Sequence, residues 1–580
     1  MRKSFLTLWP YARRYRGALA RGMGALVVKD LLGAAMPLVI GAAVDSLSKG
    51  FRLDVLLWLA GGLAIISALK GLFQYWMRVI LIGVSRDVEY DLRNDFFDRL
   101  IWLSPDFYAS HRTGDIMARA TNDLNAIRMM AGPGVMYWSE TMLTFLLAIV
   151  IMMGVDWRLT LLALLPAPLV SLAVVVFGRR IHDRFEKIQA MFSDISNRVQ
   201  ENLSSVRVLR AYVQEQAELE QFERLNRAYI AENVRLARVS ALFLPLLQSL
   251  IGLTFLIVLW GGGARLLAGD ITIGGFVMFN TYMGMLVWPM IAMGWVVNLM
   301  QRGKASLQRF SEILEARPTI TAPASPRALG APARGAVEFR SASVEYATGF
   351  ALRGVDIEIP AGATVAVVGH TGCGKTTLVS LIPRLLDPSE GSVLVDGVDL
   401  RECDPGELRR LIGFVPQETF LFSATLGENI AFGAPDATAE QIRWAAEAAG
   451  LAGDIAGFPA GYDTLIGERG ITLSGGQKQR AAIARAILRN PKILILDDAL
   501  SSVDTVTEER ILTELAGLMK DRTTILISHR VSTVRNADCI FVLDRGVLVE
   551  RGTHDELLAC GGFYADLYQK QLIEEELEAI

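Results

Sequence analysis

The sequence predicts an all-α membrane domain of six helices followed by an α/β domain built around a phosphate-binding loop. Roughly the first 300 residues contain long apolar stretches, whereas the rest mixes short apolar runs with glycine and charge. A chain of 580 residues is also too long for one hydrophobic core. The composition agrees, because 52% of the residues are hydrophobic and the mean hydropathy is +0.34.

Six stretches are long and apolar enough to cross a bilayer core of about 30 Å, which needs about 20 helical residues. They cover approximately 18–45, 55–80, 133–155, 157–178, 240–265 and 273–300. Short links join some of them, whereas two arginine-rich connections, about 81–132 and 179–239, join the others. The positive-inside rule places these connections, both termini and the α/β domain in the cytoplasm, with the spans in the inner (plasma) membrane.

The long connections have helical periodicity and few turn signals. We therefore expect the spans to continue as long cytosolic helices, with ordinary loop domains as the alternative. The N-terminal "MRKSFLTLWPYARRYRGALA" lacks a cleavage site and is interpreted as an amphipathic segment on the membrane surface.

Polar side chains within the spans have two interpretations. Such residues are costly in lipid and either face a substrate cavity or neutralise one another and lie near an interface. They are Lys29, Asp30, Lys70, Gln74, Glu140, Gln248, Asn280 and Asn298. A methionine face on the last span (Met278, Met285, Met293 and Met300) could likewise bind apolar ligands or serve as a packing seam, which we favour slightly.

A proline- and alanine-rich stretch separates the two domains. We expect the membrane domain to cover 1–315, the linker 316–335 and the α/β domain 336–580. The net charge of −3 indicates no nucleic-acid partner.

A phosphate-binding loop follows the β-branched run that ends at Val368. The segment "GHTGCGKT" matches GxxxxGK[ST] between a strand and a helical pattern, which is the context that this motif requires. Backbone N–H groups of such a loop surround phosphate oxygens, while Lys375 can reach the β- and γ-phosphates and Thr376 can bind Mg²⁺. The ATP-binding residues expected here are Gly369, Thr371, Gly372, Gly374, Lys375, Thr376 and Thr377.

Two further buried strands bring polar residues to the same edge. "ILIL" delivers Asp497, which can hold Mg²⁺ through water, and "TTILIS" delivers His529. The alternative for His529 is a structural histidine, which its position at a strand's carboxyl end disfavours.

The signature "LSGGQKQR" stands about 100 residues after the loop and just before the Asp497 strand. In this order it closely resembles the ATP-binding cassette (ABC) family, and the whole chain resembles a half-size ABC exporter. The resemblance implies that Tyr346 stacks on adenine and that Gln417 contacts Mg²⁺ and the attacking water. It also implies that Asp504 and Glu468 communicate across the dimer and with the membrane helices.

In this family, two cassettes sandwich two ATP molecules head to tail. The resemblance therefore implies that Leu473, Ser474, Gly475, Gly476 and Gln477 complete the ATP site of a second half-transporter. A single copy cannot complete either site, so the chain is expected to act as a dimer.

Asp498 departs from the family pattern, which has a water-polarising glutamate there. Aspartate is one methylene shorter, and a displacement of about 1 Å can cost about a hundredfold in rate. With Leu500, it resembles the degenerate-site subunit of heterodimeric bacterial multidrug exporters, although His529 is retained. We expect slow hydrolysis at this chain's own site and a heterodimer; a homodimer in which Asp498 acts as a weak base is the alternative.

The resulting functional expectation is ATP-driven export of drugs, lipids or peptides of hydrophobic or amphiphilic character by alternating access. A homodimeric lipid or drug flippase and, less favoured, an ATP-gated channel are the alternatives. A soluble mechanical ATPase is disfavoured by the six spans, and an importer by the fusion of both domains in one chain.

Overall fold

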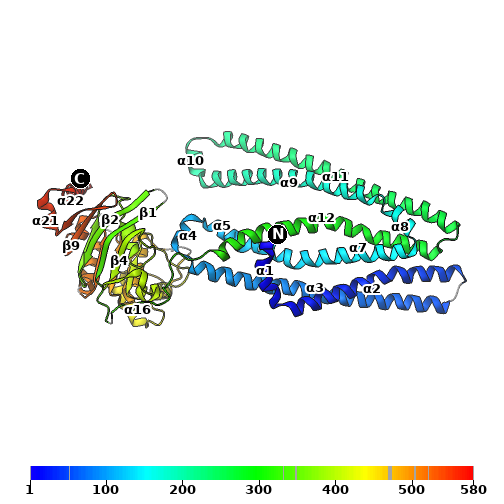
Figure 1. Cartoon of the computed structure of the whole chain (residues 1–580). Helices are drawn as coiled ribbons and strands as arrows, with labels where there is room; N and C mark the ends of the chain where they lie inside the picture. Colours follow the sequence, from blue (N-terminus) through cyan, green and yellow to red (C-terminus); the bar gives the residue numbers. More distant parts are fainter. Residues whose placement is uncertain are drawn as a thin grey trace. The chain divides into compact units, whose positions relative to one another are not determined.

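The computed structural model describes residues 2–50, 53–330, 332–346, 349–467, 473–501, 505–519, 521–528 and 530–578. By internal contacts, the chain divides into a helical unit, Met1–Ile101 with Arg112–Ala316, and an α/β unit, Trp102–His111 with Arg317–Ile580. Figure 1 shows both units, coloured along the sequence. Six apolar helical segments precede an α/β domain, so the predicted fold class is confirmed.

The helical unit consists of long helices interrupted by a few short ones. Six segments of the described chain are long and apolar enough to cross a membrane, and each predicted span falls within one of them. The elements are α1 Arg2–Arg14, α2 Arg16–Ser48, α3 Leu53–Trp102, α5 Thr113–Ala118, η1 Arg119–Asp123, α6 Leu124–Met129, η2 Met130–Gly134, α7 Val135–Val155, α8 Trp157–Leu164, α9 Ala167–Ser204, α10 Val206–Ala211, α11 Glu215–Leu267 and α12 Ile273–Glu315.

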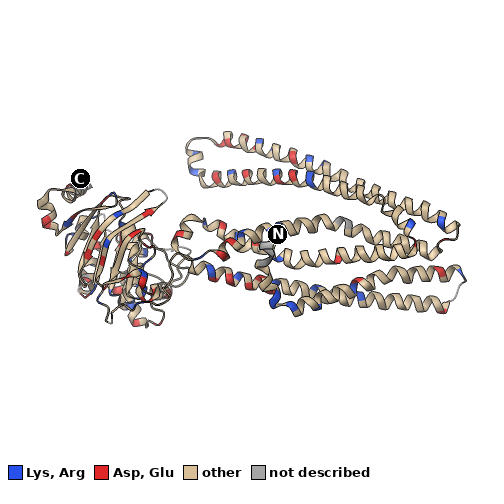
Figure 2. Cartoon of the chain, viewed as in Figure 1, with Lys and Arg blue, Asp and Glu red and all other residues tan. Residues whose placement is uncertain are grey.

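Several of these helices are much longer than a bilayer is thick. At about 1.5 Å per residue, the 50 residues of α3 extend about 75 Å, more than twice the hydrocarbon core. Figure 2 shows most of the charged residues of α9 and α11 toward the α10 end of this helix pair. The long extensions expected from periodicity are therefore present as continuous helix.

Polar side chains define where the apolar helices begin. Asp156 separates α7 from α8 and accepts hydrogen bonds from the backbone N–H groups of Arg158 (2.9 Å) and Leu159 (3.1 Å). Thr272 caps α12, and Asp45 of α2 accepts from Gly274 N at 2.7 Å. These bonds satisfy backbone donors that a helix start leaves unpaired.

Two π-helical turns, η1 and η2, interrupt the third apolar segment. Asp123, at the end of η1, is 7% exposed and accepts hydrogen bonds from Ser306 Oγ (2.8 Å) and Arg309 Nε (2.9 Å) on α12. Arg119 adds a second link, because it forms an ion pair with Glu312 at 2.9 Å. The wider turn thus places a buried carboxylate against α12.

We expect Asp123→Ala to lower the melting temperature of the detergent-solubilised protein. The change removes charge-assisted hydrogen bonds worth about 1.5 kcal/mol, the low end of the usual range because Arg309 is half exposed and can be hydrated. Exposed Asp98 on α3 provides the control, since Asp98→Ala should leave the melt unchanged. Equal melts for both variants would contradict the link.

The α/β unit contains two sheets in its described residues. A four-stranded antiparallel sheet has the order β2-β1-β4-β5, and a six-stranded sheet has the order β10-β9-β3-β8-β7-β6, parallel except for β10. The strands are β1 Val337–Tyr346, β2 Gly349–Ile359, β3 Thr364–Val368, β4 Glu390–Val395, β5 Val398–Asp399, β6 Ile412–Val415, β7 Ile493–Asp497, β8 Thr523–Ile527, β9 Cys539–Asp544 and β10 Val547–Gly552.

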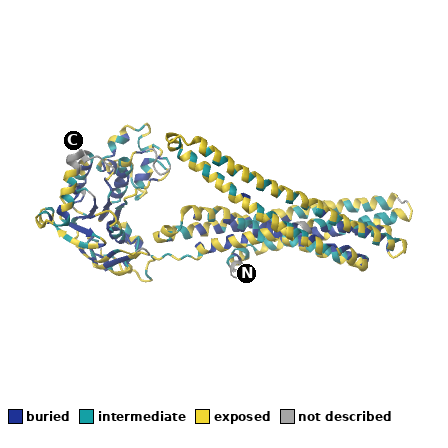
Figure 3. Cartoon of the chain, turned by 90° about the horizontal axis from the view of Figure 1, so that it is seen from above, coloured by how far each residue is buried: buried dark blue, intermediate teal, exposed yellow. Residues whose placement is uncertain are grey.

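Short helices cover these sheets. They are α13 Lys375–Leu381, η3 Leu400–Glu402, α14 Pro405–Arg410, α15 Leu426–Ala431, α16 Ala439–Ala448, α17 Ala452–Ala456, η4 Gly461–Asp463, α18 Gly475–Leu488, α19 Thr505–Met519, α20 Val531–Val534, α21 His554–Cys560 and α22 Phe563–Glu578. Figure 3 shows buried residues concentrated on the strands of this unit and exposed ones along the outer surfaces of the long helices. Strands β3, β7 and β8 are buried apolar runs, as expected for parallel strands covered on both faces.

The α/β unit also includes Trp102–His111, which contains α4 (Pro105–Ser110). Ser104 Oγ accepts hydrogen bonds from the backbone N–H groups of Thr319 and Ile320, both at 3.1 Å. These bonds attach the start of α4 to the stretch between α12 and β1. Part of the first long connection therefore groups with the α/β unit.

Candidate functional site

The phosphate-binding loop lies between β3 and α13, at the carboxyl edge of the parallel sheet, which is where open α/β sheets bind ligands. It borders a cavity of about 190 Å³. Nine of the residues predicted from sequence line this cavity: Thr371, Gly372, Gly374, Lys375, Thr376, Thr377, Gln417, Asp497 and Asp498. Segments more than 100 residues apart in the sequence thus meet at one edge because β3, β7 and β8 are neighbours in the sheet.

Backbone geometry requires glycine at two positions of the loop. Gly374 has φ +105°, and a β-carbon there would lie 2.5 Å from the carbonyl oxygen of Ala351. Gly369 has φ +149°, and a β-carbon would lie 2.1 Å from the carbonyl oxygen of Leu543. The loop therefore packs directly against β2 and the end of β9, and only glycine leaves room for this close approach of backbone to backbone.

Lys375 is buried, with 6% of its surface exposed. Its ammonium donates hydrogen bonds to the carbonyl oxygens of Gly369 (2.7 Å) and His370 (2.9 Å). Neutral carbonyls hold this cation, so a phosphate oxygen can replace them with a stronger, charge-assisted partner.

Asp497 and Thr376 form the expected metal-binding pair. Asp497 ends β7, is 1% exposed, and its Oδ1 accepts a hydrogen bond from Thr376 Oγ1 at 3.3 Å. Burial raises the pKa of the Asp497 carboxyl, and the charge of Asp498 adds to this shift. Its Oδ2 is buried and has no hydrogen-bond partner among the described residues. An unpaired carboxylate oxygen beside a hydroxyl is the hard oxygen set that Mg²⁺ prefers, so these residues fit that ion.

Asp498 has a left-handed backbone with φ +48°, which sequence reasoning did not anticipate. The N–H of Asp498 donates a hydrogen bond to Ile527 O at 2.9 Å. The carbonyl oxygen of Asp498 accepts two hydrogen bonds from Ser501, one from its N–H at 3.3 Å and one from its hydroxyl at 3.0 Å. Aspartate tolerates this conformation better than longer side chains do. The tight turn thus directs a half-buried carboxylate toward the cavity.

The signature residues occupy the start of α18 and are absent from the lining of the described cavity. Ser474 caps the helix by accepting from Gln477 N (3.2 Å), while Gln477 Oε1 accepts from Ser474 N (2.9 Å). The S-x-x-Q spacing predicts this reciprocal capping, although the sequence reasoning did not use it. Gln477 Nε2 also donates to Asp454 Oδ1 at 2.9 Å, so α17 fixes the exposed helix start.

Other predicted residues lie elsewhere. Tyr346 ends β1, is 46% exposed and does not line the described cavity. Glu468, Asp504 and His529 lie outside the described residues. Ala351 of β2 and Ile527 of β8 also line the cavity. The sequence does not mark them as site residues, because they belong to no motif and reach the cavity only through the packing of their strands.

The polar residues of the apolar helices divide into two groups. Lys29, Asp30, Lys70, Gln74 and Glu140 line a single cavity of the helical unit, whereas Gln248, Asn280 and Asn298 do not. Of the methionine face, Met285 lines this cavity, and Met278 is buried in a neighbouring apolar cluster.

Comparison with known proteins identifies the family. The ABC transporter transmembrane region model matches residues 20–290, and the ABC transporter model matches residues 352–501. The probable multidrug resistance ABC transporter ATP-binding/permease protein YheI of Bacillus subtilis is 39% identical over 92% of both chains. The chain belongs to the ABC exporter family.

Two further ABC relatives match across nearly the whole chain. The multidrug resistance-like ATP-binding protein MdlA of Escherichia coli is 37% identical over 98% of this chain and 95% of its own. An ATP-dependent lipid A-core flippase of Syntrophus aciditrophicus is 34% identical over 99% of this chain and 95% of its own. A bacterial Atm1-family ABC exporter solved with ATP bound has a TM-score of 0.79 and 29% identity, covering 96% of this chain and 98% of that chain. These ABC relationships assign ATP binding and hydrolysis to the α/β unit.

Proposed function

We propose that this chain is one half of an ATP-driven exporter that moves hydrophobic or amphiphilic molecules, such as drugs, lipids or peptides, across the inner (plasma) membrane. The observation that carries the proposal is the presence, in one chain, of six apolar segments and a phosphate loop whose Lys375 and Thr376 meet Asp497 of β7 at one cavity. Relatives named as multidrug transporters and a lipid A-core flippase support the cargo class.

Different residues of this chain would bind the phosphates, the adenine and Mg²⁺ of the nucleotide. Loop N–H groups and Lys375 bind phosphate oxygens, and exposed Tyr346 stacks on adenine. Thr376, Gln417 and Asp497 would hold Mg²⁺, which supplies charge neutralisation of the phosphates. Asp498, which lines the cavity, is assigned the role of the water-orienting base, and Gln417 and His529 are assigned to the same reaction.

A second half-transporter must complete the site. Ser474 and Gly475 are exposed at the start of α18 and outside their own chain's cavity, where they are available to a partner's γ-phosphate. We propose that Asp504 and Glu468 relay the state of this interface. The short carboxylate of Asp498 favours a partner that contributes a catalytic glutamate, hence a heterodimer with one slow and one fast site. The cassettes and both termini face the cytoplasm.

The test is ATP-dependent accumulation of a fluorescent amphiphile by proteoliposomes that contain the chain and its co-purified partner. An exporter concentrates the probe against its gradient, whereas a channel only dissipates a gradient. A second measurement tests the ATP site: Asp497→Asn on this chain should weaken the Mg²⁺ dependence of nucleotide binding there, because the side chain loses its charge and one of its two oxygens. Probe movement that ATP does not drive uphill would contradict export.

A further inference from the structure

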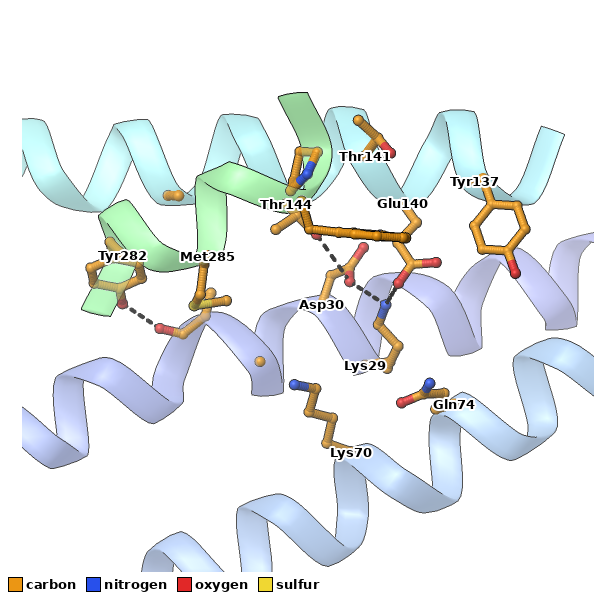
Figure 4. Close-up of a pocket in the computed structure, with 15 residues that line it drawn as sticks. Lys29, Asp30, Lys70, Gln74, Tyr137, Glu140, Thr141, Thr144, Tyr282 and Met285 are labelled. Carbon is orange, nitrogen blue, oxygen red and sulfur yellow. Dashed lines mark hydrogen bonds and ion pairs between the residues drawn. The ribbon is translucent and has the colours of Figure 1, made fainter. Parts of the chain in front are cut away.

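A polar cavity of about 260 Å³ lies within the helical unit. Figure 4 shows its polar side chains, which come from α2, α3 and α7, with Tyr282 and Met285 contributed by α12. All four helices belong to candidate membrane spans, where an ionised group persists only with a partner or a function. The charges on the cavity wall therefore indicate what the cavity binds.

When all three are ionised, the charged groups of Lys29, Asp30 and Glu140 form a cluster with one negative charge in excess. Lys29 is 4% exposed and forms ion pairs with Asp30 Oδ1 (2.7 Å) and Glu140 Oε1 (2.5 Å). One ammonium thus serves two carboxylates. Asp30 is 5% exposed, and in the described part of the chain its buried Oδ2 has no hydrogen-bond partner. This oxygen lacks a donor, which a bound ligand would supply.

Lys70 adds a positive charge to the cavity wall, opposite in sign to the excess charge of the Asp30–Lys29–Glu140 cluster. It enters from α3 beside Gly33 of α2, where a β-carbon would lie 3.4 Å from its Cε and 3.6 Å from its Nζ. No carboxylate of the described chain lies within 4.0 Å of this ammonium. The absence of a side chain at Gly33 leaves room for the ammonium at the cavity wall.

We propose that this cavity binds the zwitterionic head group of an amphiphile, with a primary ammonium at Asp30 and Glu140 and an anionic phosphate or carboxylate at Lys70. The inference rests on the proposed export function and specifies its cargo. A ligand with net charge would leave either Lys70 or the Asp30–Lys29–Glu140 cluster unpaired in a low-dielectric site, which is costly. A zwitterion satisfies both.

The geometry also specifies the ammonium and the tail. Asp30 Oδ2 needs an N–H donor, which a primary ammonium has and a quaternary ammonium lacks. The cavity volume falls below the range of about 300–1,000 Å³ that holds whole drug-sized ligands, so it accommodates a head group. Met285 and the exposed Trp288 are apolar residues of the lining, which the chain of the amphiphile can contact.

Four amphiphiles that share one brominated alkyl chain test this assignment, with phosphoethanolamine, phosphocholine, phosphate or amine heads. Binding to the full-length protein in nanodiscs is measured by quenching of Trp288, and Trp288→Phe identifies its signal. The phosphoethanolamine amphiphile should bind about tenfold more tightly than the other three, since each lacks one charge-assisted contact. Free phosphoethanolamine without the alkyl chain should bind more weakly than its amphiphile.

Two variants should change the preference in opposite directions. Lys70→Gln leaves the negative excess and should make the amine amphiphile the tightest ligand, whereas Glu140→Gln removes that excess and should favour the phosphate amphiphile. Asp30→Asn is a second route to the latter change. Lys304→Gln, at an exposed lysine of α12 outside the cavity, should change nothing.

Equal affinities for the four heads, or a preference that neither variant changes, would overturn the assignment. Free phosphoethanolamine that binds as tightly as its amphiphile would overturn the amphiphile as ligand. Transport of a neutral amphiphile is measured in parallel. Uphill transport without head-group selectivity defeats this inference alone, whereas selective binding without uphill transport of any amphiphile defeats the proposed export function.

Discussion

Replacement of Asp498 by glutamate should raise the Mg²⁺-dependent ATPase of the purified chain by about a hundredfold, because the added methylene moves the carboxylate about 1 Å toward the attacking water. We expect this increase in ATPase rate only at protein concentrations at which light scattering shows a dimer. Each ATP site needs the signature of one copy and the phosphate loop of the other copy. In the complete heterodimer, where one site is already fast, the same change should at most about double the turnover.

The backbone supplies the matched control for this experiment. At φ +48°, a residue with a longer side chain carries a left-handed strain of about 1–2 kcal/mol. Asp498→Gln has the length and the strain of the glutamate variant but no base, so it should melt at the same temperature as Asp498→Glu and stay slow. Robust wild-type turnover that disappears in Asp498→Asn would instead establish aspartate as a sufficient base and favour the homodimer.

Gly374→Ala should weaken ATP binding by about a hundredfold. The backbone there has φ +105°, and the new β-carbon would meet the Ala351 carbonyl oxygen at 2.5 Å and Leu352 Cδ2 at 2.9 Å. Left-handed strain and overpacking against a fixed strand together cost about 2–5 kcal/mol, of which about 2.7 kcal/mol corresponds to a hundredfold. Photolabelling with azido-ATP measures the loss.

Gly372→Ala separates the effect of left-handed backbone strain from the effect of overpacking against β2. Gly372 is in the same loop with φ +79°, but a β-carbon there would have no neighbour within 4 Å among the residues that the structure describes. This variant should therefore lose only the strain component, about tenfold. Similar losses in the two variants would show that contact with β2 does not shape the loop.

Much of the ATP site is predictable because its signals are local. The strand that ends at Val368, the glycines after it and the helix from Lys375 are adjacent in sequence, so their periodicity and spacing define the loop. The strand before Asp497 is equally recognisable as a short buried run. The apolar stretches also show directly as membrane spans, since span length is a property of contiguous sequence.

The left-handed turn at Asp498 and the close approach of Gly374 to Ala351 lack such signals. The Asp498 turn depends on its hydrogen bond to Ile527 of the neighbouring β8, and the Gly374 contact depends on how β2 of the other sheet packs against the loop. Tertiary contacts thus fix the backbone regardless of the intrinsic preference of the residue. Likewise, the polar residues of the spans had two equally good interpretations. Sequence spacing does not reveal which helix faces meet.

The sequence by itself determined the six apolar segments, the order of the phosphate loop, signature and Asp497 strand, and the missing methylene at Asp498. Only the tertiary structure decided that Lys29 pairs with Glu140 across 111 residues, that Asp30 keeps one oxygen unpaired and that Lys70 has no carboxylate beside it in the described chain. The reason is physical. Hydropathy and motif spacing act along the chain, whereas the charge balance of a cavity depends on the rotation and packing of helices that are distant in sequence.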